Sequence, residues 1–102
     1  MEGKKTFFND KRYITNTIYD IIELQNAELI FSDAKHGRVY YKLNMYNYEW
    51  ELMYTITEKG DKESEVTLRL IGDRYDKEVE IRREFALLEV MLGGGADVVI
   101  VN

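Results

Sequence analysis

The single histidine of the chain, His36, lies three residues after Asp33 and next to Gly37. A catalytic histidine needs a positioned partner, such as a carboxylate, and a cleft that holds the substrate. Here the residues from Ala34 to Gly37 are predicted to form a polar turn, with Gly37 free to adopt a positive φ. Since a histidine in such a turn is normally a surface residue, we expect no catalytic role for His36.

Four carboxylates form a second candidate group, at Asp73, Asp76, Glu78 and Glu80. Such a group can bind a metal ion or transfer protons. The spacing of a calcium-binding loop is missing, however, and the helix dipole alone favours acidic residues at a helix N-terminus. We therefore expect these residues to begin a helix, and we expect no metal site.

Five aromatic residues form a third candidate site, for a small apolar or aromatic ligand. Three of them share one face of the predicted sheet, and two more can complete a cavity between that sheet and the helices: Tyr41, Trp50, Tyr54, Phe31 and Phe85. Sites for such ligands are concave and lined by aromatic side chains. The alternative is a well-packed core, because inward-facing aromatic residues are also what a sheet needs.

Sequence motifs of enzymes are missing. There is no cysteine, which excludes disulfides, thiolate zinc sites and cysteine nucleophiles. Gly93 to Gly95 follows a predicted helix and lacks the lysine and hydroxyl residue of a phosphate-binding loop. We expect neither enzymatic activity nor a cofactor.

The balance of charges limits the partners. The 102 residues include 19 acidic and 14 basic side chains, a net charge of −5. Phosphate backbones need a positive surface, so we expect no nucleic-acid partner. The best local basic group, which we interpret as a solvated N-terminus, is Lys4, Lys5, Lys11 and Arg12.

With no apolar run near the ~20 residues of a membrane span and no signal peptide, we expect a cytoplasmic protein without a membrane partner.

Three apolar/polar alternations between Arg38 and Ile71 determine the predicted architecture. The clearest places Trp50, Leu52, Tyr54 and Ile56 opposite Glu49, Glu51, Met53 and Thr55. A period of two predicts strands with one buried and one wet face, and short connections predict hairpins. Thr6 to Phe8 is predicted to be an edge strand or a staple on the following helix, and Leu29 to Phe31 a further short strand.

Two amphipathic helices flank this sheet. The first is predicted from Lys11 to about Asn26, with Asp10 as its N-cap and the apolar stripe Ile14, Ile18, Ile21 and Ile22. The second is predicted to begin at Asp73 or Asp76 and to end at Gly93, with the stripe Ile81, Phe85, Leu88 and Leu92. We predict one α+β domain over 1–102, in the order β-α-β-β-β-β-α plus a C-terminal strand. Its antiparallel meander of four or five strands has both helices on one face.

Apolar residues beyond this core predict self-association. The second helix carries another stripe nearly opposite the first, and after a glycine hinge the tail (93–102) has a strong strand preference. We expect this tail to pair with a sheet edge, in its own sheet or in a neighbouring molecule. The predicted interface of a two-fold dimer comprises Val79, Ala86, Val90, Val98, Val99, Ile100 and Val101.

The order of these elements over residues 6–92 resembles a trimmed helix-grip (START-like) domain. The most similar stretch runs from Ser64 to Asp73 and leads into the helix at Asp76. Full helix-grip domains are longer and contain more strands, and their ligand cavity depends on that extra length. The resemblance therefore implies the layered fold, and function has to be inferred from the residues.

We expect a non-catalytic interaction module that forms a homodimer or binds another protein. Two further functions stay open. One is a small-ligand carrier that uses the aromatic residues of the sheet. The second is an acidic mimic of nucleic acid, which requires Glu49, Glu51 and the acids of the second helix to cluster without interspersed lysine or arginine.

Overall fold

The computed structural model describes residues 1–45, 47–72 and 77–101, and it confirms the α+β class. The predicted start of the second helix, at Asp73 or Asp76, lies outside these residues. Along the chain the elements are β1 (Glu2–Phe7), α1 (Lys11–Leu24), β2 (Glu28–Asp33), β3 (Arg38–Met45), β4 (Tyr48–Gly60), β5 (Glu63–Ile71), α2 (Lys77–Leu92) and β6 (Val99–Val101).

The sheet has six antiparallel strands in the order β2-β3-β4-β5-β1-β6, more than the four or five predicted. Strands β2 to β5 form the expected meander, and β1 then pairs with β5 along its whole length. The N-terminal strand is longer than predicted because polar residues 2–5 belong to it. A Cβ on Gly3 would lie 2.3 Å from Cγ2 of Ile81, so the missing side chain lets α2 approach this strand.

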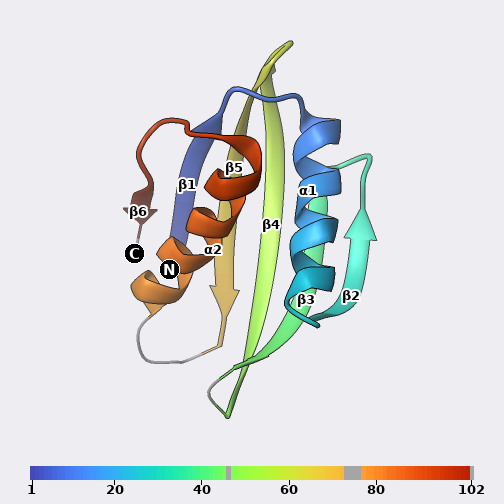
Figure 1. The fold of residues 1–102 in the computed structure, drawn as a ribbon, viewed down its shortest axis with the longest axis vertical. Coiled ribbons are helices and arrows are strands. Elements are labelled where there is room, and N and C mark those ends of the chain that lie inside the picture. Colours follow the sequence, from blue (N-terminus) through green and yellow to red (C-terminus); the bar gives the residue numbers. More distant parts are fainter. Residues whose placement is uncertain (46, 73–76, 102) are drawn as a thin grey trace.

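The predicted alternation is confirmed in β4. Trp50, Leu52 and Tyr54 are buried, whereas Glu49 is exposed and Glu51 is partly exposed. Both helices cover the same face of the sheet, α1 over β3 and β4 and α2 over β1 and β5 (Figure 1). The apolar side chains of the strands and helices therefore form one core between the two layers.

Helix α1 begins where the sequence predicts. Asp10 caps it by accepting a hydrogen bond of 2.7 Å from the backbone amide of Tyr13. The four predicted isoleucines are all buried against the sheet: Ile14, Ile18, Ile21 and Ile22. The helix ends at Leu24, two residues before the predicted end, and Asn26 then adopts a φ of 55°.

Helix α2 buries Ile81, Phe85 and Leu88 of its predicted stripe, and the fourth member, Leu92, is partly buried against the core. It ends as expected at Gly93, whose φ is 85° and whose amide donates a 2.8 Å hydrogen bond to the carbonyl of Glu89. In the described part of the chain, neither helix combines the length and apolar character of a membrane span. The helix also buries two acidic residues, Glu80, which belongs to the predicted group of carboxylates, and Glu84, which the sequence pattern did not single out.

The C-terminal tail folds into its own sheet, the first of the two pairings that the sequence allows. Strand β6 pairs antiparallel with β1, with Ile100 opposite Gly3. The glycine hinge is held where Gly95 meets β1, since a Cβ on Gly95 would lie 2.2 Å from the backbone oxygen of Thr6. Strand β6 is thus the last strand on one side of the sheet, as Figure 1 shows, and β2 is the last on the opposite side.

Candidate functional site

The turn between β2 and β3 holds His36 as a surface residue. Its ring Nδ1 lies 2.6 Å from Oδ2 of Asp33, and 62% of its side chain is exposed. The hydrogen bond from His36 lowers the pKa of the Asp33 carboxyl below its usual value. This local pair stabilises a turn, and nothing in it resembles a cleft for a substrate.

The acidic residues of α2 form ion pairs. Glu78 lies 3.1 Å from the Arg82 guanidinium, and Glu80 lies 2.7 Å from that of Arg83. Among the described residues, no three histidine or acidic side chains are grouped as a metal site. Asp73 and Asp76, which complete the predicted group, lie outside the described residues.

Four of the five predicted ligand-binding aromatic residues are buried in the core between the sheet and the helices: Tyr41, Trp50, Tyr54 and Phe85. The rings of Tyr41 and Tyr54 stack with centroids 5.9 Å apart. Phe31 differs from the expectation, because it lies on the edge strand β2 with 52% of its surface exposed. A register shift between Leu29 and Phe31 interrupts the alternation there, and Phe31 lies apart from the remaining four.

A network of buried and half-buried polar side chains lies where α2 meets α1 and β3, and we call it the Glu84 cluster. It comprises Gln25, Tyr41, Glu80, Arg83 and Glu84. The Tyr41 hydroxyl donates to Oε1 of Glu84, while Nη2 of Arg83 lies 2.8 Å from Oε2 of the same carboxylate. Arg83 also donates to Gln25, at the end of α1, over 2.8 Å. The cluster thus joins both helices to β3.

Burial dominates the electrostatics of this cluster. It raises the pKa of Glu84, against the opposing effects of the Tyr41 hydrogen bond and the Arg83 charge. Burial also raises the pKa of the Tyr41 and Tyr54 hydroxyls well above their ordinary values, so both stay protonated at neutral pH. Because Glu84 is fully buried, its carboxyl cannot reach a dissolved substrate, and the cluster acts as a structural clamp.

Three buried polar atoms elsewhere in the core make no hydrogen bond to the described residues: Trp50 Nε1, Tyr54 Oη and Ser64 Oγ. The sequence pattern did not reveal the cluster, although it held one signal. Glu84 follows Ile81 by three residues and precedes Leu88 by four, which places it within the apolar stripe of the helix.

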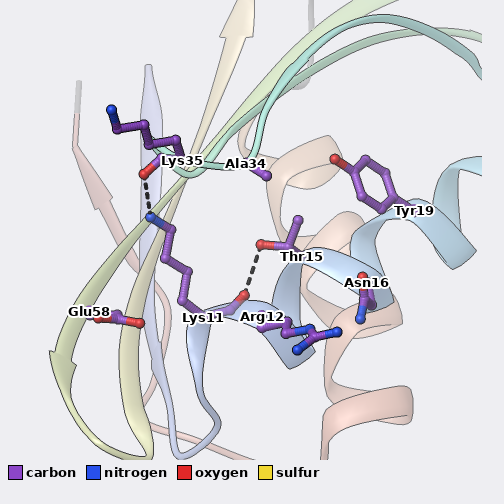
Figure 2. A pocket seen from close by; sticks show the side chains of 8 residues that line it. All are labelled: Lys11, Arg12, Thr15, Asn16, Tyr19, Ala34, Lys35 and Glu58. Atoms are coloured by element: carbon purple, nitrogen blue, oxygen red, sulfur yellow. Dashed lines mark hydrogen bonds between the residues drawn. The ribbon is translucent and has the colours of Figure 1, made fainter.

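An open pocket lies between α1, the β2–β3 turn and the end of β4 (Figure 2), and we call it the α1 pocket. Its volume is about 510 Å³, and its lining residues are Lys11, Arg12, Thr15, Asn16, Tyr19, Ala34, Lys35 and Glu58. Lys11 Nζ donates a 2.9 Å hydrogen bond to the carbonyl of Lys35, which ties the helix to the turn. The sequence interpretation of Lys11 and Arg12 as solvated residues missed this pocket, because it depends on where the turn docks.

The seven predicted interface residues do not share one surface. Val79, Ala86 and Val90 are exposed on α2, whereas Val98 and Ile100 pack against the core. The remaining two, Val99 and Val101, alternate with Ile100 and so lie on the sheet face opposite the helices. The predicted interface residues thus lie on different sides of the domain.

Comparison with known proteins adds no relative. No protein-family model matches the chain, and no curated protein is similar to it. The function therefore has to be inferred from three features of this chain, namely the Glu84 cluster, the α1 pocket and the exposed apolar face of α2.

Proposed function

We propose that this chain is a non-catalytic interaction module that forms a two-fold dimer through the outer face of α2. The observation that carries the proposal is the exposed stripe of Val79, Ala86 and Val90 on that helix. Val79 is 65% exposed and Val90 is 84% exposed. A helix that covers a sheet needs only one apolar face, and the first stripe of α2 already supplies it.

The neighbouring helix extends this apolar surface. At 3.6 residues per turn, Val79, Ala86 and Val90 lie on the side of α2 turned away from the sheet. On α1, Tyr13 is 54% exposed and Leu24 is 71% exposed. Apolar groups gathered on one layer of a small domain favour contact with another protein surface.

The charges of α2 favour a second copy of the chain as the partner, in spite of the net charge of −5. Glu78 is paired with Arg82 on the helix itself, and Glu89 is paired with Lys5 of β1 at 2.6 Å. Because these carboxylates are neutralised within each molecule, two α2 faces can approach with little repulsion. The small Ala86, near the middle of the stripe, allows two helix backbones to come close.

Strand β6 offers a second route to the same function, since an outer strand can pair with another chain. The strand is only three residues long, and Ile100 packs inward. We therefore favour α2 as the dimer contact and retain β6 as the competing surface.

A mimic of nucleic acid and a small-ligand carrier have weaker support as the main function. Glu49 and Glu51 lie 3.2 and 3.8 Å from the Lys42 ammonium, and α2 intersperses its acids with arginine. Such interspersion disfavours a mimic of nucleic acid. For a ligand carrier, the α1 pocket is better placed than the buried aromatic residues of the sheet.

Sedimentation velocity over a range of concentrations tests the proposal. We expect a dimer for the unaltered chain, a monomer for Val90→Lys and a dimer for the matched Val99→Lys on β6. A lysine near the C-terminus of α2 suits the helix dipole, so Val90→Lys should leave the helix folded. A monomeric unaltered chain at high micromolar concentration would contradict the proposal, and loss of the dimer only in Val99→Lys would transfer the contact to β6.

A further inference from the structure

We propose that the α1 pocket binds a small organic anion, a carboxylate or phosphate group joined to a flat apolar body. The pocket volume of about 510 Å³ lies within the range of small-molecule sites, roughly 300 to 1,000 Å³. The site is independent of the proposed dimer contact, because its walls come from α1, the β2–β3 turn and β4.

The first reason is the concentration of positive charge. The pocket has three cationic side chains, Lys11, Arg12 and Lys35, against the single carboxylate of Glu58. This local excess occurs in a chain with a net charge of −5. Two of the cations occupy the first turn of α1, which contains no acidic residue. Even when the Asp10 carboxylate that caps α1 is counted beside Glu58, the cations outnumber the carboxylates here, which favours an anionic ligand.

The second reason is that three polar side chains of the pocket already have a protein partner, whereas the guanidinium of Arg12 is available to a ligand. Lys11 Nζ is already bonded to the carbonyl of Lys35, and the Thr15 hydroxyl donates to the carbonyl of Lys11 over 2.8 Å. The Tyr19 hydroxyl is bonded to Ser32. Arg12, by contrast, makes no ion pair with any described residue, which leaves its planar guanidinium available for an oxyanion.

Arg12 and Asn16 are one helical turn apart and lie on the same side of α1 (Figure 2). Together they present amide and guanidinium donors to one place. The Lys35 ammonium points away from α1 in Figure 2, so it contributes to the local potential and makes no direct contact. Arg12 is therefore the residue that we expect to bind the anionic group.

The third reason concerns the rest of the ligand. The Tyr19 ring comes from α1, and Ala34 comes from the turn on the opposite side of the pocket (Figure 2). Since the Thr15 hydroxyl is bonded to its own helix, this residue presents its methyl group. These groups suit a flat apolar body, and inorganic phosphate alone would leave them unused.

Titration of the ¹⁵N-labelled protein with four simple compounds tests this inference by NMR. The probes are phenyl phosphate, benzoate, inorganic phosphate and phenol. We expect the amide signals of Thr15, Tyr19 and Ala34 to shift with phenyl phosphate or benzoate, and to shift far less with phosphate or phenol. A stronger response to benzoate would assign a carboxylate ligand, and a stronger response to phenyl phosphate would assign a phosphate ester. An equal response to inorganic phosphate, or no response at these amides, would overturn the proposal.

Two substitutions in the pocket have opposite expected effects. Arg12→Gln should weaken binding of the better probe about tenfold, because a charge-assisted contact is lost. Glu58→Gln should strengthen it, because the one opposing carboxylate is removed.

Arg69→Gln, at an exposed position of β5, makes the same change in charge as Arg12→Gln and should leave binding unchanged. Equal weakening by Arg12→Gln and Arg69→Gln would reduce the effect to overall charge and overturn the proposal. Val90→Lys should bind as the unaltered chain does, whatever its oligomeric state.

Discussion

The hydroxyl of Tyr41 on β3 donates a hydrogen bond to the carboxylate of Glu84 on α2, and both residues are fully buried. This contact brings a carboxylate into the core between the two layers, where its second oxygen is held by Arg83. A buried carboxylate is costly unless it is hydrogen-bonded and paired. The position of α2 on the sheet is therefore determined by a polar contact as well as by apolar packing.

Tyr41→Phe removes the donor and leaves Glu84 with one partner fewer. We expect it to lower the free energy of unfolding by about 1–3 kcal/mol, measured by urea denaturation. Tyr54→Phe is the matched control, because the stacked Tyr54 has a buried hydroxyl without a hydrogen bond to the described residues. Its loss should leave stability unchanged or raise it. If Tyr54→Phe destabilised the protein as much as Tyr41→Phe, the hydrogen bond would not be the cause.

Adjacent arginines on α2 should differ strongly in their contribution to stability. Arg83 pairs with Glu80 and Glu84, which are 5% and 0% exposed, whereas Arg82 pairs with Glu78, which is 53% exposed. Arg83→Met leaves two buried carboxylates without their cation and should cost about 3 kcal/mol in thermal or urea unfolding. Arg82→Met should cost less than about 1 kcal/mol. Equal effects of the two substitutions would show that the buried pair contributes no more than a surface pair.

The sequence was sufficient to predict the elements whose side chains alternate or recur regularly. Trp50 and Tyr54 face the core because alternate side chains of a strand lie on the same face of the sheet. Ile14 and Ile18 face it because residues four apart lie on the same side of a helix. Strand β1 was only partly predicted, since Gly3 contributes no side chain to the pattern and Lys5 is buried through its ion pair with Glu89.

The candidate sites were harder to predict because each depends on contacts between distant segments. Buried Glu84 receives one of its hydrogen bonds from Tyr41, 43 residues earlier in the chain. The α1 pocket exists because the turn docks on the helix through Lys11 and Lys35. A pattern within one segment contains neither relationship, and the same holds for the pairing of Ile100 in β6 with Gly3 in β1.

Adjacent glycines in the tail provide a test of how β6 is held. A Cβ on Gly95 would lie 2.2 Å from the Thr6 carbonyl oxygen, whereas a Cβ on Gly94 would meet nothing within 4 Å. Gly95→Ala should therefore displace the tail and remove the protection of the β6 amides in hydrogen exchange. Gly94→Ala should leave this protection intact. Unchanged protection in Gly95→Ala would show that the tail does not depend on its close approach to β1.

The raised pKa of Glu84 makes a prediction about pH. Burial holds the folded-state pKa above the ordinary value of 4.5, so the folded protein binds this proton more tightly than the unfolded chain does. As pH rises from about 4.5 through the folded-state pKa, the unfolded chain releases the proton first, and the contribution of Glu84 to stability decreases.

Glu84→Gln removes this titration while it keeps a side chain of the same shape. The stability of the unaltered protein relative to Glu84→Gln should therefore be greatest at low pH and should decline as pH rises through that window. Urea unfolding of both proteins at a series of pH values measures the difference, and titrations shared by the two proteins cancel. A difference that grew in favour of the unaltered protein with rising pH would mean that Arg83 and Tyr41 outweigh burial and lower the pKa of Glu84.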